Sequence, residues 1–363
     1  MAVRGIQKIR GRRMKPIMNQ NANLGGMPSM MVFDRKVKRM QRSRAVLLDS
    51  EGEFDYVRKH MAANVVGRIE DVSRSFPLAL DVGSHRGHLL ELIRKEDGLE
   101  GKGGLGGIET LIQCDMSEEA LLHCKPPTAE KYPSSSARAC GGEAKRVKVL
   151  NVVCDEEFLP FEPGSVDLVL SNMSLHWVND LPGALRQIRQ ASSLILDCAQ
   201  PSPDGVFIGS MLGGNTLTEL RQCLMMAEME IEGGISQRTS PLAQVSDCGN
   251  LLQSAGFAIP TVDTDTFQVA YADMFELMKH VQSMGEGNCN LNTRGYIHRD
   301  TLHLAAEKYS ELYGSEGSVT ATFQACYMIG WAPHESQPKP LKRRDGYRGD
   351  VVPEAGSGSA ESR

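Results

Sequence analysis

Apolar residues occur along this chain in short runs that alternate with segments of helical spacing. Candidate helices lie at residues 118–123 and from 182 to about 196. Five apolar runs have the length of buried strands, at residues 78–82, 112–115, 147–153, 166–172 and 205–211. Strands that alternate with helices predict an α/β fold with a parallel sheet and right-handed crossovers.

The C-terminal third continues with longer elements. Residues 261–271 and 318–331 are predicted as strands. Apolar residues at helical spacing predict helices at 215–232, 245–256, 274–284 and 300–313, the last with Asp300 as its N-cap. We therefore expect an antiparallel pair of strands and extra helices after the parallel part of the sheet.

The first strand ends in an acid, and the turn that follows has a glycine at each end. Asp81 lies near the end of the strand, and Gly83 and Gly87 bound the turn before the next helix. Glycine lets backbone and ligand approach closely, and a helix N-terminus offers free N–H groups, which suits a nucleotide-like ligand. The spacing fits neither the dinucleotide nor the phosphate-loop fingerprint. A purely structural strand-to-helix turn is the alternative.

Acids also follow the second and third strands. Asp115 ends the second strand, and Asp155 and Glu156 follow the third. In doubly wound folds, an acid after the second strand accepts hydrogen bonds from ribose hydroxyls. Because these acids belong to the same sheet edge as the glycine turn, they strengthen the prediction of a nucleotide-like ligand there.

These residues resemble the class I S-adenosylmethionine-dependent methyltransferases over about residues 54–211. The resemblance is carried by Asp115 and by segments 79–83, 155–161, 167–171, 175–182 and 203–207. It implies a mostly parallel seven-stranded sheet with helices on both faces. The residues that it implies for S-adenosylmethionine binding are Asp81, Gly83, Ser84, Gly87, Asp115, Asp155, Glu156 and Asn172. His85 stands where the family usually has glycine, and a left-handed backbone there would cost roughly 1 kcal/mol.

By a more specific resemblance, the chain is identified as a member of the mitochondrial complex I assembly factor 5 family. Segments 32–36, 76–81, 174–182, 207–217, 262–265, 298–301 and 327–331 carry it. The family is described as arginine hydroxylases built on a methyltransferase scaffold. The resemblance implies S-adenosylmethionine as a cofactor and, as substrate, an arginine of an early-assembling iron–sulfur subunit in the peripheral arm of complex I. It also implies contact with other assembly factors, and a place in the mitochondrial matrix, peripheral to the inner membrane.

The residues alone favour a different reaction. Methyl transfer needs in-line positioning more than acid–base residues, so the absence of a catalytic motif does not oppose it. Oxygen insertion needs a metal, a flavin or a radical, and the sequence assigns none. Two alternatives stay open: a conventional methyltransferase on a carboxylate or a carrier-bound thioester, and a non-catalytic assembly chaperone, which His85 in the glycine turn favours.

Candidate substrate contacts lie after the third and fourth strands. His176 and Trp177 follow the fourth strand, where the ligand crevice of an open parallel sheet lies. A neutral His176 would act as a base and Trp177 would pack a substrate side chain, or both are buried packing residues. The acids Asp155, Glu156 and Glu157 would suit a guanidinium group.

Two histidine patterns suggest a metal, and neither is assigned as a site. His298 and Asp300, with the distant His334, have the residue types of a two-histidine, one-carboxylate iron site, although a helix cap explains Asp300 without metal. His85 and His88 are spaced i, i+3, but no third ligand is near them in sequence.

The chain ends differ in charge from the middle. The net charge is −5, which gives no reason to expect nucleic acid as a partner. No acid precedes Asp34, whereas the start carries Arg4, Lys8, Arg10, Arg12, Arg13 and Lys15. A basic, acid-free start predicts a mitochondrial transit segment at 1–30. We expect a methyltransferase-like domain at 31–336. The polar composition of residues 337–363 predicts a disordered tail.

Two further features bound the class of protein. No apolar run is long enough to span a bilayer. The nine cysteines include no Cys-x-x-Cys pair, which argues against a disulfide scaffold or a zinc ribbon. Insertions relative to the family occur at 98–107, 134–145 and 192–202, and the first two are predicted to be surface loops.

Overall fold

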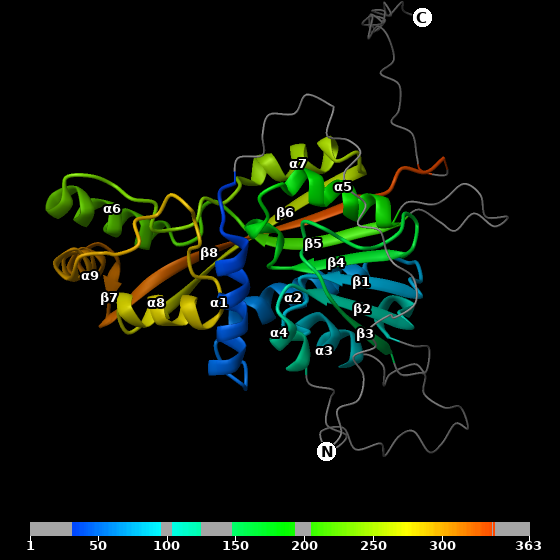
Figure 1. The fold of residues 1–363 in the computed structure, drawn as a ribbon, viewed down its shortest axis with the longest axis horizontal. Coiled ribbons are helices and arrows are strands. Elements are labelled where there is room, and N and C mark those ends of the chain that lie inside the picture. Colours follow the sequence, from blue (N-terminus) through cyan, green and yellow to red (C-terminus); the bar gives the residue numbers. More distant parts are fainter. Residues whose placement is uncertain (1–30, 96–103, 125–146, 193–204, 336, 338–363) are drawn as a thin grey trace, which may run out of the picture. The chain divides into compact units, whose positions relative to one another are not determined.

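The computed structural model describes residues 31–95, 104–124, 147–192, 205–335 and 337 (Figure 1). All the helices and strands given below lie in one compact unit that ends at Pro333. The transit segment at 1–30 and the tail beyond residue 337 lie outside the described residues. So do the insertion at 134–145 and most of those at 98–107 and 192–202.

One twisted sheet forms the centre of this unit (Figure 1). Its strand order is β3-β2-β1-β4-β5-β8-β6, and the two-residue β7 (Gly314–Ser315) pairs with β8. The parallel strands are β1 (Leu78–Val82), β2 (Thr110–Asp115), β3 (Lys148–Val153), β4 (Leu168–Asn172) and β5 (Val206–Leu212). The antiparallel strands are β8 (Ser318–Trp331) and β6 (Ala258–Tyr271). The mostly parallel seven-strand path predicted from the sequence is confirmed.

Helices cover both faces of the sheet, and the strand sequences explain why. Along β4, Leu168 and Leu170 belong to one buried cluster and Val169 to another. A strand alternates its side chains between faces, so an uninterrupted apolar run is buried on both. The first cluster is covered by α2 (Tyr56–Glu70) and α3 (His88–Lys95), and the second by α5 (Leu181–Ser192) and α7 (Val245–Ser254).

The remaining helices flank the two ends of the sheet. α4 (Glu118–Leu122) and the 3-10 turn η2 (Leu105–Gly107) lie next to β2 in the chain, and η3 (Leu175–Trp177) follows β4. α6 (Thr218–Glu232), α8 (Met274–Ser283) and α9 (Arg299–Tyr313) accompany the long antiparallel pair (Figure 1). α1 (Arg35–Leu48) crosses the carboxyl ends of the parallel strands, and it contacts both α4 and α8.

Two predicted helix starts are wrong, because the helix expected from residue 215 begins at Thr218 and the N-cap of the last helix is misplaced. α9 begins at Arg299, and its N-cap is His298, whose backbone is extended with φ −64° and ψ 144°. Asp300 therefore lies inside the first turn and does not cap the helix. A carboxylate in the first turn still favours the helix through the dipole. This explains why Asp300 was predicted as the N-cap, two residues after the observed N-cap His298.

Candidate functional site

The turn after β1 has the backbone that the glycine pattern predicts. Gly83 and Gly87 have φ values of 71° and 79°, in the left-handed region that favours glycine. A Cβ atom on Gly83 would overlap Ser174 Oγ, and one on Gly87 would overlap Cys124 Sγ. His85, between them, is also left-handed with φ 50°. A non-glycine residue pays about 1–2 kcal/mol for this conformation, so the turn is both close-packed and strained.

Asp115 is the fully buried acid at the end of β2. Its Oδ2 accepts the backbone N–H of His85 at 3.0 Å, and its Oδ1 accepts that of Ser117 at 2.8 Å. The Nη1 atom of Arg42 lies 3.3 Å from Oδ2. The sequence-predicted acid is thus at the predicted edge, tied to the glycine turn, but it already has a cationic partner from α1.

Arg42 is the centre of a buried polar cluster. Its side chain is 3% exposed and forms a short ion pair with Glu156, and its Nη2 donates to Ser174 Oγ at 3.0 Å. Ser174 in turn donates to Glu156 Oε1 at 2.6 Å. Burial alone would raise the pKa of Glu156, but the guanidinium groups of Arg42 and Arg35 overcome it and lower that pKa to about 2. Glu156 is therefore ionised and neutralised by its own chain.

Arg35 makes a second contact to the same acids. Its Nη2 donates to Asp155 Oδ1 at 2.6 Å and pairs closely with Glu156, and its Nε lies 3.8 Å from Glu157. Its Nη1 also donates to the Trp177 carbonyl oxygen at 3.1 Å. The three acids that the sequence offers as a guanidinium site do hold a guanidinium, and it belongs to α1 of this chain.

Three other predicted cofactor residues lie around this cluster. Asp81 is buried, and desolvation together with the nearby Asp115 raises its pKa to about 8, so its carboxyl group is protonated at neutral pH. Ser84 is buried in the turn, and its backbone N–H donates to the Cys114 carbonyl. Asn172 has a structural role, because its side chain bridges Arg58 O and Ser210 Oγ at 3.0 and 2.8 Å.

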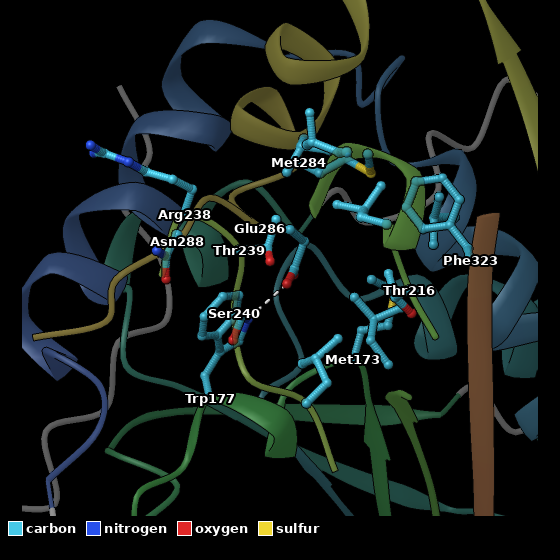
Figure 2. Close-up of a pocket in the computed structure, with 16 residues that line it drawn as sticks. Met173, Trp177, Thr216, Arg238, Thr239, Ser240, Met284, Glu286, Asn288 and Phe323 are labelled. Atoms are coloured by element: carbon cyan, nitrogen blue, oxygen red, sulfur yellow. Dashed lines mark hydrogen bonds between the residues drawn. The ribbon is translucent and has the colours of Figure 1, made fainter. Parts of the chain in front are cut away.

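A cavity of about 80 Å³ lies between the ends of β4 and β5 and the C-terminal helices (Figure 2). Figure 2 shows Trp177 hydrogen-bonded to Glu286 on one side, with Met284 and Phe323 across from them. The remaining lining is mostly apolar, with Thr216, Arg238, Thr239, Ser240 and Asn288 as polar members. The Oγ atom of Ser240 is buried and has no hydrogen-bond partner among the described residues. The cavity therefore combines an aromatic wall with a buried carboxylate.

Glu286 accepts hydrogen bonds from three side chains. Its Oε1 accepts from Arg58 Nη2 at 2.6 Å, and its Oε2 contacts Trp177 Nε1 at 2.7 Å and His176 Nε2 at 3.0 Å. Burial would raise the pKa of Glu286, but the His176 hydrogen bond and the nearby charge of Arg58 overcome it, so that pKa is held well below its usual range. Glu286 is therefore ionised and paired with Arg58, at the wall of a largely apolar cavity.

His176 and Trp177 are the two predicted substrate contacts that the structure brings to this carboxylate. Burial lowers the pKa of His176, so its ring is neutral at pH 7, with Nε2 next to Glu286 and Nδ1 without a hydrogen-bond partner among the described residues. Lys38 Nζ lies 3.3 Å from the centroid of the Trp177 ring, and Phe33 packs edge-on against it. Both residues are therefore packing residues, and Trp177 also lines the cavity.

The other predicted pair lies elsewhere. His298 and Asp300 are exposed at the start of α9, and among the described residues they belong to no group of side chains that could hold a metal ion. Sequence reasoning missed Arg35, Arg42 and Glu286, each of which comes from an element distant in sequence from its partners. The acid at 286 had no local signal, because it follows α8 in an irregular segment.

Acid should weaken the α1 cluster in a defined pH window. The pKa of Glu156 is about 2 in the folded chain and 4.5 as the reference for the unfolded chain. Between these values the unfolded chain binds more protons, so the free energy of unfolding falls as pH falls from about 4.5 to 2. We expect thermal unfolding of Glu156→Gln to depend less steeply on pH in this window than that of the wild type. Exposed Glu311→Gln is the control, and equal slopes for wild type and Glu156→Gln would contradict the assignment.

Comparison with known proteins places this arrangement in a family. A sequence family described as "Methyltransferase domain" matches residues 80–192. "Arginine-hydroxylase NDUFAF5, mitochondrial" of Danio rerio is 46% identical over 315 residues, which cover 86% of this chain and 87% of that protein. The Homo sapiens protein of the same name is 43% identical over 87% of this chain and 81% of its own length. The chain belongs to the NDUFAF5 arginine-hydroxylase family. Its members are enzymes by name, built on a methyltransferase fold.

A more distant relative shares only the methyltransferase part. "Malonyl-[acyl-carrier protein] O-methyltransferase" of Xylella fastidiosa is 28% identical over 55% of this chain and 62% of its own length. The NDUFAF5 relatives are named mitochondrial. Among the residues that the structure describes, no helix combines the length and the apolar character needed to cross a lipid bilayer.

The methyltransferase domain supports S-adenosylmethionine binding, and the described residues fit this cofactor in composition. A left-handed glycine turn lies after β1, and an acid ends β2, as ribose recognition requires. However, Arg42 forms ion pairs with both Asp115 and Glu156. The composition of the site therefore fits the cofactor, and its acids form ion pairs with arginines of α1 in this structure.

Proposed function

We propose that this protein hydroxylates an arginine side chain of an early-assembling, iron–sulfur subunit in the peripheral arm of complex I, and thereby acts in complex I assembly in mitochondria. Membership of the NDUFAF5 arginine-hydroxylase family carries the proposal. The substrate subunit and any companion assembly factors come from the family resemblance, so they are the part that experiment must establish.

The cavity beside Trp177 suits a guanidinium group. Glu286 is a buried anion, and its two oxygens offer about four acceptor positions, of which three are taken. A guanidinium stacks on aromatic rings and donates to carboxylates in one plane. The volume of about 80 Å³ is several times the roughly 10–15 Å³ that one water molecule needs on this measure, so the cavity can hold a small polar group. We assign this cavity to the substrate arginine.

The cofactor is proposed to bind at the other cluster. S-adenosylmethionine would lie on the turn of Gly83, Ser84 and Gly87, with its ribose on Asp115 and its adenine near Asp155 and Glu156. Because α1 holds these acids through Arg35 and Arg42, cofactor binding requires that α1 withdraw. A bound substrate subunit that draws α1 away would then favour cofactor entry.

The decisive experiment is mass spectrometry of the purified candidate subunit after incubation with the protein, S-adenosylmethionine, oxygen and a reductant, because one atom of O₂ enters the arginine and the other must be reduced to water. A gain of one oxygen on an arginine is the expected result. A methyl group instead would identify a methyltransferase, and no change in mass would favour a non-catalytic assembly chaperone.

Methyl transfer is the second candidate because one observation favours it. The match to the methyltransferase domain spans residues 80–192, and a relative named as an O-methyltransferase aligns with 55% of the chain. When bound, S-adenosylmethionine supplies an activated methyl group. A carboxylate or a carrier-bound thioester would be the acceptor, and the same mass measurement on such a substrate tests it.

The protein is proposed to work in the matrix, peripheral to the inner membrane, after residues 1–30 have directed import. Replacing Arg4, Arg10, Arg12 and Arg13 by glutamine removes four positive charges from the basic start, so a fluorescent fusion should stay in the cytosol. The matched control replaces the same four arginines by lysine, which keeps the charge and should keep the import. Equal mitochondrial fluorescence of the glutamine and lysine variants would refute the transit role.

A further inference from the structure

Three metal-ligating side chains meet beside the glycine turn. Asp55 precedes α2, His85 lies in the turn, and His88 is the first residue of α3. One potential ligand atom from each lies within 4.8 Å of the others. All three residues are buried, with exposures of 1%, 1% and 7%. In the part of the chain that the structure describes, this is the one group of three such residues with this spacing.

Three polar atoms of this group lack a partner. Oδ1 of Asp55 and both ring nitrogens of His85 are buried and make no hydrogen bond among the described residues. The other carboxylate oxygen, Asp55 Oδ2, forms ion-pair contacts with Arg86 Nε at 3.0 Å and His88 Nε2 at 3.3 Å. Buried polar atoms are almost always satisfied in folded proteins, so three unsatisfied atoms in one place point to a missing ligand.

The local backbone suits metal binding. His85 is held at φ 50°, a strained conformation of the kind that clusters at functional sites. The two rings stack with an interplanar angle of 19° and centroids 6.2 Å apart.

Nearby arginines shape the charge balance. Arg86 is held away from the centre of the group by Ala45 O at 3.0 Å and Asp49 at 3.8 Å, although its Nε reaches Asp55 Oδ2. Arg58 is anchored on Glu286. Asp55 Oδ1 therefore remains open to a cation.

We propose that Asp55, His85 and His88 bind a divalent transition-metal ion. Two histidines and one carboxylate with open positions are the ligand set of non-haem Fe²⁺ oxygenases, so the ion is assigned as Fe²⁺. Bonds of about 2.0–2.2 Å to such ligands place the ligand atoms about 3 Å apart. Binding thus closes the group from its present spacing of up to 4.8 Å by side-chain movement of about an ångström.

The site extends the proposed function in one respect. Oxygen insertion requires a metal, flavin or radical, and the choice of Fe²⁺ rests on the proposed hydroxylation. Metal binding itself does not rest on it, because the ligands are read from geometry and burial. The backbone N–H of His85 also donates to Asp115 at 3.0 Å, so the metal site and the cofactor turn share one backbone segment.

Metal retention tests the proposal without turnover. The purified full-length protein is incubated anaerobically with one equivalent of Fe²⁺, desalted, and its iron measured by inductively coupled plasma mass spectrometry. We expect the wild type to retain about one iron per chain, and its thermal unfolding temperature to rise with Fe²⁺, because an ion that binds only the folded chain stabilises it. His85→Gly and Asp55→Asn should retain less than about a tenth as much and show no such rise.

The variants are chosen to separate ligation from folding. Glycine adopts the left-handed backbone of position 85 without strain, so His85→Gly should fold at least as well as the wild type. His303→Ala changes an exposed histidine on α9 and should retain iron fully. No iron in the wild type, or equal iron in wild type, His85→Gly and Asp55→Asn, would overturn the site. Iron retention without arginine hydroxylation would overturn only the proposed function.

Discussion

Arg42→Ala is expected to bind S-adenosylmethionine at least about tenfold more tightly than the wild type. In the wild type, the cofactor must displace a guanidinium that is paired with buried Glu156 and Asp115. Breaking a buried pair costs about 3–5 kcal/mol, whereas the cofactor's hydrogen bonds to a carboxylate return only about 1.5–3 kcal/mol. Removing this competition should recover more than the roughly 1.4 kcal/mol that corresponds to a tenfold change. Isothermal titration calorimetry measures it directly.

Arg39→Ala is the matched control, because Arg39 is exposed on the same helix. It should bind the cofactor like the wild type. Arg42→Ala should also unfold at lower temperature in the absence of ligand, since buried Asp115 loses its cationic partner and Glu156 keeps only Arg35. Weaker cofactor binding by a folded Arg42→Ala would show that Arg42 is a ligand of the cofactor, and the proposed withdrawal of α1 would be wrong.

The fold could be predicted from the sequence because its signals are local. Runs such as Leu168-Val169-Leu170 are apolar on both faces and therefore must lie in a covered parallel sheet. α1 escaped prediction for a physical reason: its buried positions include Lys38 and Arg42. A helix that buries its cations has no apolar stripe to reveal it.

The candidate site was predictable only in part. Asp115 and the glycine turn were found because the carboxyl ends of parallel strands meet at one edge. The partners of these residues come from far along the chain: Arg42 and Glu156 are 114 positions apart, and His176 and Glu286 are 110 apart. Asp55 could not be predicted from the sequence for the same reason, since no local sequence pattern connects it with His85. Tertiary packing brings these pairs together, and local sequence patterns do not encode it.

Glu286→Gln is expected to lower arginine hydroxylation about 10- to 100-fold. The change keeps the size of the side chain and removes the charge that would pair with the substrate guanidinium. Hydrogen bonds to a charged group contribute about 1.5–3 kcal/mol, which corresponds to roughly that factor. The hydroxylated fraction of the target arginine, followed over time by mass spectrometry, gives the rate. Glu311→Gln, an exposed acid on α9, is the control and should leave the rate unchanged.

Because Glu286 also contacts Arg58, His176 and Trp177, folding of Glu286→Gln has to be checked by circular dichroism and thermal unfolding. Trp177→Phe, which keeps the aromatic wall and removes one hydrogen bond to Glu286, should lose less activity than Glu286→Gln if charge dominates. A folded Glu286→Gln that hydroxylates at the wild-type rate would exclude this cavity as the arginine site.

A folded Glu286→Gln with lowered hydroxylation also separates the catalytic role of the protein from a scaffold role, when it is expressed in cells that lack the protein. Stalled complex I would show that assembly needs the modified arginine, whereas full complex I beside an unmodified arginine would show that assembly needs only the scaffold.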